Sequence, residues 1–419
     1  MTVSFRQALQ VWAKIGCLSF GGPAGQIALM HRELVEDKGW LSEKEYLAAL
    51  NFCMLLPGPE AMQLATYAGW KLHGVKGGLA AGLLFVLPGA AIVLSLSVLY
   101  ASFGQLPIIA ALFYGVKAAV LAIVLEALLR VARRALKSNV DWAVAGLAFL
   151  ALFCFDLPFP LIIVAAALFG FWRSNPVEPQ SPDVLPPTVN LIKTTLLWGA
   201  IWLVPLAALA LVLGGDHVLT QIGVFFSKLA VVTFGGAYAV LSYMAQAAVV
   251  DKNWLQPQQM IDGLGLAETT PGPLILVTEF VAYMAAYGKL GSVWAGVCGA
   301  MVSLWMTFAP CFLFIFAGAP YIDAIGQRPK LAGALASITA AVVGVILNLS
   351  LWFALHVLFA RVERLGTGWF RPWQPDWPSF DAFAAVLGAV ASVLLLRWHL
   401  GIIRTLMVCA GVGGIWRFF

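Results

Sequence analysis

The sequence predicts an all-α, polytopic membrane protein of two inverted repeats, in which broken or re-entrant helices lie beside full transmembrane helices. Composition is the first reason: hydrophobic residues make up 61% and charged residues 11% of 419 residues, against about 45–50% and about 25% in soluble domains. The second is that the apolar segments are interrupted by Gly and Pro at matching places in both halves. Such duplicated breaks are typical of transporters that bind their cargo at the repeat interface.

The duplication has a constant offset in the numbering, since 20 + 214 = 234 and 57 + 214 = 271. The motifs Phe20-Gly21-Gly22, Trp40-Leu41 and Pro57-Gly58-Pro59 recur as Phe234-Gly235-Gly236, Trp254-Leu255 and Pro271-Gly272-Pro273. Two further pairs match at this offset, Lys14 with Lys228 and Ser19 with Thr233. Because the matches fall on Gly, Pro, Trp and Lys rather than on common apolar residues, they indicate a true internal repeat.

Uninterrupted apolar segments predict full crossings, because about 20 apolar residues span a bilayer. They run near residues 78–100, 107–129, 194–213, 291–318, 331–358, 381–396 and 398–416. Residues 140–172 are split by Asp156-Leu157-Pro158 and predict a hairpin of two short helices. The domain prediction is therefore a first repeat at 1–172, a Pro-rich cytoplasmic linker at 173–190, a second repeat with its preceding crossing helix at 191–360, and a C-terminal membrane hairpin at 361–419.

The broken segments lie at residues 5–30, 47–73, 221–247 and 260–288. They either cross as kinked helices or enter and return as re-entrant hairpins. With a cytoplasmic N-terminus, re-entrant hairpins keep the basic loop 31–46 inside, so the positive-inside rule favours them. The same rule makes the second repeat inverted. The basic residues Arg361, Arg364 and Arg371 do not fit this scheme, and their Trp-rich surroundings suggest an interfacial segment.

The duplicated breaks are candidates for an anion site. A helix that restarts after Pro-Gly-Pro presents free backbone N–H groups and a partial positive charge, and Gly-Gly lets backbone approach a ligand without a Cβ. The alternative is a structural kink, which is common in membrane helices. The candidate substrate-binding residues are Ser19, Gly21, Gly22, Pro57, Gly58, Pro59, Thr233, Gly235, Gly236, Thr269, Thr270, Pro271, Gly272, Pro273, Lys14 and Lys228.

Three carboxylates near the breaks, Glu60, Glu268 and Glu279, are candidates for proton coupling, since acidic residues in membrane segments often mark ion pathways. Glu60 has an alternative role in capping its half-helix. The lysines Lys14 and Lys228 have the alternative of extending to the membrane interface.

The sequence gives no support to an enzyme. The six cysteines show no metal or disulfide spacing, the five histidines are dispersed, and no nucleophile–base pair or phosphate-binding loop is present. We therefore expect no cofactor, no metal and no nucleic-acid partner, and we expect the lipid bilayer as the surroundings.

The motifs resemble a known family. The runs Phe20-Gly21-Gly22-Pro23, Leu56-Pro57-Gly58-Pro59-Glu60-Ala61 and Glu268-Thr269-Thr270-Pro271-Gly272-Pro273-Leu274 are similar to those of the two-domain bacterial chromate ion transporter family, over about residues 5–360. Two departures are Met62, where Gln is expected, and Glu279, where the second domain usually has Gln.

The resemblance implies a secondary transporter in the bacterial inner membrane that exports chromate, driven by membrane potential, protons or both. The alternatives are sulfate or another oxyanion as cargo, and a non-transporting membrane scaffold or sensor. Whether the chain forms a homodimer stays open at this stage.

Overall fold

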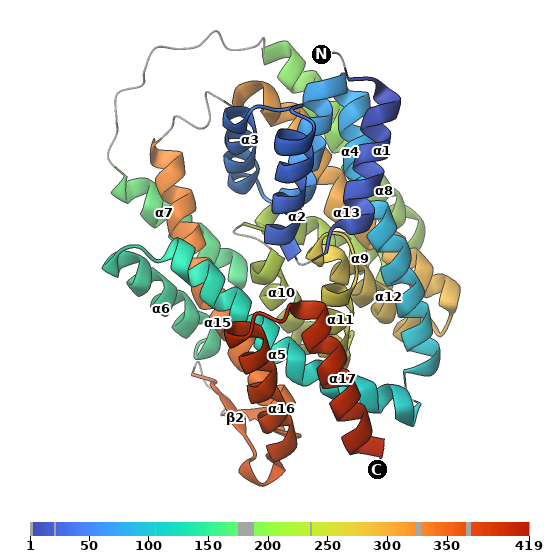
Figure 1. Ribbon diagram of the computed structural model, residues 1–419, viewed down its shortest axis with the longest axis vertical. Helices are drawn as coiled ribbons and strands as arrows, with labels where there is room; N and C mark the ends of the chain where they lie inside the picture. The colour runs from blue at the N-terminus through green and yellow to red at the C-terminus, as the bar shows by residue number, and fades with distance from the viewer. Residues whose placement is uncertain are drawn as a thin grey trace. The chain divides into compact units, whose positions relative to one another are not determined.

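The computed structural model describes residues 3–20, 22–104, 106–174, 188–234, 237–322, 329–365 and 370–418 (Figure 1). Helices dominate these residues, and their only strands are one short pair, so the predicted all-α class is confirmed. Five helical segments are long and apolar enough to cross a bilayer, as expected of a multi-pass membrane protein. They are Glu60–Phe103, Pro107–Ala135, Leu191–Leu213, Val293–Tyr321 and Pro329–Leu358. Most of the predicted linker, residues 175–187, lies outside the described residues.

The chain divides into two compact units, and each unit takes segments from both halves of the sequence. The first unit comprises Met1–Val98, Asn175–Ala237 and Thr270–Ala332, and the second comprises Leu99–Ser174, Tyr238–Thr269 and Gly333–Phe419. The repeats and the compact units are therefore different divisions of the chain. All four Gly and Pro interruptions fall in the first unit or at its boundary.

The first unit contains the broken helices. Its elements are α1 (Phe5–Leu18), α2 (Gly22–His31), η1 (Arg32–Asp37), α3 (Glu43–Leu55), most of α4 (Glu60–Phe103), α8 (Thr188–Leu213), α9 (Val218–Val232), η3 (Leu274–Leu276), α12 (Val277–Leu290), α13 (Val293–Gly318) and η4 (Ala319–Tyr321). α1 and α3 begin with capping boxes at Ser4 and Ser42, which satisfy backbone N–H groups at the helix starts. α13 packs against α8, α9 and α12.

The chain reverses direction at the breaks of the first repeat. Lys14 on α1 forms an ion pair with Glu33, 19 positions later, and Lys71 on α4 lies 3.6 Å from Glu45 on α3. A continuous helix would separate residues 19 positions apart by roughly 28 Å, at a rise of about 1.5 Å per residue. These segments of the first repeat therefore form helical hairpins, and their re-entry on one side of the membrane stays a prediction.

α4 consists of two helical arms joined by a tight turn. His73 and Gly74 leave the helical conformation, and Gly74 has a φ of 61°. The arms then pack so closely that a Cβ at Gly69 would meet the side chain of Ala81. The first arm thus returns from the break at residues 57–59, and the second arm forms the predicted crossing.

The two repeats enter the first unit from opposite ends. The His73 ring forms a hydrogen bond with the Val3 carbonyl just before α1. Gly78, five residues after His73, packs on Phe316. Phe316 in turn contacts Trp198 in the first half of α8, so α1 begins near that half. α9 instead begins at the far end of α8, where Thr220 donates to the Leu209 carbonyl. α1 and α9 therefore run inward in opposite directions, as inverted repeats require.

The second unit is a bundle held by small residues. Its elements are α5 (Pro107–Ala135), α6 (Asn139–Phe153), α7 (Phe159–Arg173), α10 (Ala237–Gln246), η2 (Ala247–Asp251), α11 (Pro257–Thr269), α15 (Pro329–Leu358), β1 (Val362–Arg364), β2 (Trp373–Pro375), η5 (Trp377–Ser379), α16 (Ala382–Ser392), η6 (Val393–Arg397) and α17 (Ile402–Phe418). Gly115 on α5 lies against the backbone of Cys409 on α17, and Gly344 on α15 lies against Ala145 on α6. Such contacts bring helix backbones close together, as is usual in membrane bundles.

Two details of the second unit bear on the predictions. The predicted hairpin at 140–172 is present as α6 and α7. The Arg- and Trp-rich stretch after α15 forms the antiparallel pair β1–β2, in which Val362 pairs with Pro375. There Arg364 forms an ion pair with Asp156 and stacks over Trp373.

Candidate functional site

Two hydrogen bonds in the first unit join the breaks of one repeat to those of the other. The Gly58 N–H donates to the Thr233 carbonyl, and the Gly272 N–H donates to the Ser19 carbonyl, both at 2.8 Å. Because 58 + 214 = 272 and 19 + 214 = 233, the same contact is made in both directions. This reciprocity is typical of parts related by a two-fold axis. We call this pair of bonds the reciprocal brace.

The acceptors of the brace have matching local geometry. Ser19 and Thr233 end α1 and α9 with φ, ψ of −76°, 70° and −77°, 85°, close to an inverse γ-turn. Their hydroxyls donate back to the carbonyls of Ile15 and Leu229. In this structure, the two predicted hydroxyl ligands thus serve their own helices, while their carbonyls face the brace.

The donors of the brace need glycine. Gly58 and Gly272 have φ of +117° and +94°, where residues with a Cβ are strained. After each Pro-Gly-Pro a helix restarts, α4 at Glu60 and η3 at Leu274. Since the glycine N–H groups are used in the brace, the groups that remain for an anion are those of the first turns after it.

Two glutamines strengthen the brace, and both belong to the first repeat. The buried Gln26 donates from its amide to the Gly272 carbonyl at 2.5 Å, and Gln63 donates to the Pro57 carbonyl at 2.6 Å. Their counterparts in the second repeat are Val240 and Val277. The sequence analysis missed both glutamines as site residues; the signal was a polar amide in an apolar helix beside each break.

Gly89 was also missed. It follows Pro88 in the second arm of α4, and a Cβ there would collide with the Pro271 carbonyl. Gly272 also packs against Gly89: a Cβ added at Gly272 would lie 3.3 Å from the Gly89 Cα. Gly89 therefore gives the second Pro-Gly-Pro room against α4.

The two matched lysines have different surroundings. Lys14 lies 2.5 Å from Glu33, a carboxylate that is 2% exposed, whereas Lys228 is exposed and takes part in none of the ion pairs described for the chain. The position that matches Glu33 is Ala247. The role of both lysines in binding an anion stays a prediction. In this structure the Lys14 ammonium pairs with the Glu33 carboxylate, which competes with an anion for it.

Replacing Lys14 by Met should destabilise the protein by about 1–3 kcal/mol, because Glu33 would keep a buried charge without its partner. A fully buried pair would lose about 3–5 kcal/mol, and the half-exposed Lys14 side chain reduces the effect. The midpoint of thermal unfolding measures it. Lys228→Met is the matched control and should be close to neutral; an equal loss in both variants would contradict the ion-pair role.

The three predicted coupling carboxylates are held in three different ways. Glu60 is half-buried in the first turn of α4, where a carboxylate is favourable, and both its capping and its coupling role stay predictions. Glu268, in the second unit, is 5% exposed and accepts a hydrogen bond of 2.8 Å from the Tyr238 hydroxyl. Glu279, in the first unit, is fully buried, and neither of its oxygens has a hydrogen-bond partner among the described residues.

The remaining candidates are placed as follows. Thr269 donates to the Leu266 carbonyl, and Thr270 is buried. Gly22 starts α2 with a φ of +69° and open space where a Cβ would lie. Gly21, Gly235 and Gly236 lie outside the described residues.

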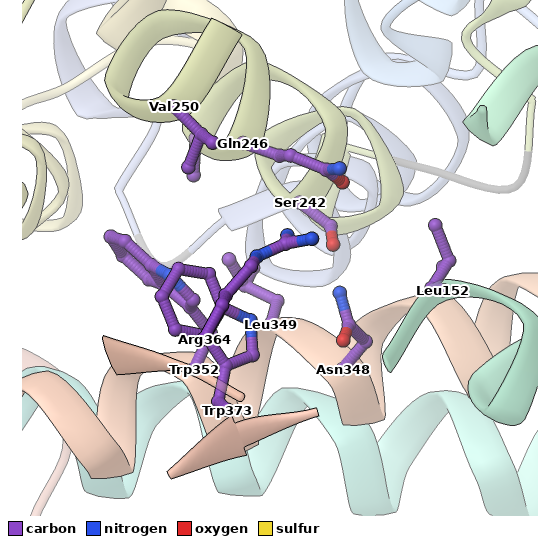
Figure 2. Close-up of a pocket in the computed structure, with 10 residues that line it drawn as sticks. Leu152, Ser242, Gln246, Val250, Asn348, Leu349, Trp352, Arg364 and Trp373 are labelled. Atoms are coloured by element: carbon purple, nitrogen blue, oxygen red, sulfur yellow. The ribbon is translucent and has the colours of Figure 1, made fainter. Parts of the chain in front are cut away.

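A small cavity in the second unit is not a site for an oxyanion. Figure 2 shows Arg364 pointing towards Ser242 and Gln246 of α10, with Asn348 of α15 nearby. Its volume is about 10 Å³, which is enough for roughly one water molecule. Arg364 is also engaged by Asp156, at 2.5 Å. The cluster therefore has a structural role.

Comparison with known proteins identifies the family. The model of the chromate transporter family matches residues 6–171 and 220–415. The chain belongs to the chromate transporter family. Relatives of this transporter include a chromate transport protein of Cupriavidus metallidurans, 31% identical, in an alignment that covers 82% of this chain and 81% of the relative.

A probable chromate transport protein of Synechococcus elongatus is 32% identical (82% and 83% covered), and a chromate transport protein of Pseudomonas aeruginosa is 31% identical (87% and 85% covered). No solved structure matches the chain. The relatives are transport proteins, which points away from an enzyme.

Proposed function

We propose that this protein is a secondary transporter that exports chromate from the cytoplasm across the bacterial inner membrane, with its N-terminus in the cytoplasm. The observation that carries the proposal is the reciprocal brace, which brings broken helix ends of both repeats together. Broken helices at a repeat interface are where transporters of several folds bind their cargo. The chromate transport proteins among the relatives support chromate as the cargo.

The chemistry of the breaks suits a tetrahedral dianion. Helix starts carry partial positive charge and unpaired N–H groups, and they follow both Pro-Gly-Pro motifs. Gly22, with its open Cβ position, adds a place where backbone can reach the anion. We assign binding to these groups together with Gly21, Gly235 and Gly236. The exposed Lys228 would supply attraction rather than a fixed contact.

Membrane potential supplies enough free energy for export. Moving a dianion out of a negative interior releases about 2 × 2.3 kcal/mol per 100 mV, so roughly 150 mV gives about 7 kcal/mol. That corresponds to about a 10⁵-fold gradient. Protons bound at Glu60, Glu268 or Glu279 would add to this driving force without being required for it.

Everted vesicles test the proposal. Vesicles that contain the protein should accumulate chromate when their interior is made positive. Uptake that ignores both voltage and a pH gradient would contradict export by this mechanism. Competition at equal concentration with sulfate and molybdate tests the cargo: stronger inhibition by sulfate than by unlabelled chromate would make sulfate the better substrate.

A further inference from the structure

Glu279 lies in a closely packed seam between α12 and α13, which are neighbours in Figure 1. The two helices are antiparallel across the short turn at residues 291–292. In this seam Gly296 contacts the Tyr283 ring, and a Cβ at Gly299 would meet Ala282 and Ala286. Residues three or four apart share a helix face, so Glu279 continues the stripe of Ala282 and Ala286. Ser303 likewise continues that of Gly299, so the helix register places Glu279 and Ser303 one turn beyond the contact of Gly299 with Ala282.

Several buried hydroxyls of α12 and α13 lack partners. The side-chain oxygens of Thr278, Ser303 and Thr307 are buried and have no hydrogen-bond partner among the described residues, like both oxygens of Glu279. Other buried hydroxyls of the first unit donate instead to the carbonyl four residues earlier. Thr66 donates to Met62 and Ser97 donates to Val93 in this way. The oxygens of Glu279 and of these three hydroxyls are therefore unsatisfied among the described residues.

No charged side chain balances Glu279 within the described helices packed around it. α13 has no charged residue, α9 has only the exposed Lys228, and the remaining charge of α12 is Lys289, at its other end. The other titratable groups of α13 are Cys298 and Cys311, which are neutral thiols in their ordinary state. A buried carboxylate without a partner is costly, so Glu279 is stable only when a proton or a bound cation neutralises it.

We propose that Glu279, with the hydroxyls of Ser303, Thr307 and Thr278, forms a binding site for a dehydrated alkali cation, sodium. The ligands are all hard oxygens, which suit alkali and alkaline-earth cations. One carboxylate neutralises one positive charge, which favours a monovalent ion over calcium or magnesium. Glu279 stands in the first turn of α12. Its oxygens accept no hydrogen bond from the described residues, so it does not cap the helix.

The site lies close to the candidate anion site along the chain. Glu279 follows Pro273 closely, and η3 between them is the irregular turn that begins the half-helix. In transporters with broken helices, coupling ions bind beside the breaks. This inference rests on the proposed transport function for its role in coupling, but the cation site itself can be measured without chromate.

The test is the thermal unfolding of the purified full chain in detergent, with sodium chloride exchanged for choline chloride at constant ionic strength. Sodium should raise the unfolding midpoint saturably by a few degrees, because a ligand that binds only the folded state stabilises it. Glu279→Gln should abolish this shift and Ser303→Ala should reduce it. Ser97→Ala removes a back-bonded hydroxyl of the same unit and should keep the full shift.

Three results would overturn the site. The first is a wild-type unfolding midpoint that is the same in sodium and in choline at every pH. The second is a wild-type unfolding midpoint that changes with pH but not with sodium. The third is a Glu279→Gln variant whose unfolding midpoint still rises with sodium. Ser303→Ala retains the charge and provides the comparison if Glu279→Gln does not yield folded protein. A chain that binds sodium but moves no chromate contradicts only the proposed function. A chromate exporter without the sodium shift contradicts only the cation site.

Discussion

Gly58→Ala and Gly272→Ala should each reduce chromate transport by about tenfold or more while the protein still inserts into the membrane. Both glycines have φ values that a residue with a Cβ adopts only at a cost of about 1–3 kcal/mol. A Cβ at Gly58 would also lie 2.8 Å from the Gln63 amide, and one at Gly272 would lie 2.9 Å from Leu276. Either change therefore displaces an N–H of the reciprocal brace. A cost of about 1.4 kcal/mol in the transporting conformation already lowers transport by a factor of about ten.

Chromate uptake into everted vesicles, normalised to the amount of inserted protein, measures this effect. Gly199→Ala on α8 is the matched control, because Gly199 is helical and has no atom within 4 Å of its Cβ position. It should transport normally. Full transport by both Gly58→Ala and Gly272→Ala would contradict the role of the brace, whereas no uptake even by the unmodified protein would favour a membrane scaffold without transport.

Lys117→Met should lower the stability by about 3–5 kcal/mol, the usual cost of removing one partner from a buried ion pair. In the second unit, Lys117 on α5 lies 3.5 Å from Asp262 on α11, and their side chains are 19% and 6% exposed. Tyr100 also donates to Asp262 at 2.7 Å. Without Lys117, the carboxylate would keep its buried charge with only the Tyr100 hydroxyl, among the described residues, as a partner.

Adding Asp262→Asn to Lys117→Met should restore most of the lost stability. The neutral amide still accepts from Tyr100 but needs no counter-charge. Unfolding of the two single variants and the double variant in detergent forms the cycle that measures the interaction. Losses that simply add up in the double variant would show that the ion pair contributes nothing to the stability.

The sequence predicted most elements of the fold, because they follow from local patterns. The predicted full crossings at 381–396 and 398–416 are the exception, since they are not among the five described segments that are long and apolar enough to span a bilayer. The breaks at Gly21-Gly22 and Pro57-Gly58-Pro59 separate helices as expected, and α6 and α7 form the predicted hairpin on either side of residues 154–158. The interleaving of the two units did not follow, since it depends on which distant helices pack together. The strands β1 and β2 were also missed, because each has only three residues.

The residues of the reciprocal brace could be located from the sequence, but their bonds could not. The constant offset between the repeats located Ser19, Gly58, Thr233 and Gly272, yet nothing local shows that each donor bonds to the opposite repeat. Likewise, Lys117 resembles the lysines that extend to the membrane interface, whereas it pairs with Asp262. Pairings over such distances are set by tertiary packing, which periodicity does not encode.

The reciprocal brace also constrains the order of events during biosynthesis. Gly58 is incorporated into the chain well before its acceptor, Thr233, because 233 − 58 = 175. At about 5–20 residues per second, this is a delay of roughly 9–35 s. Throughout that time the first break has a backbone donor without its final acceptor, in surroundings where unpaired polar groups are costly. The nascent first repeat must therefore hold this break near water or another protein until the second repeat arrives, so the centre of the first unit closes only late in translation.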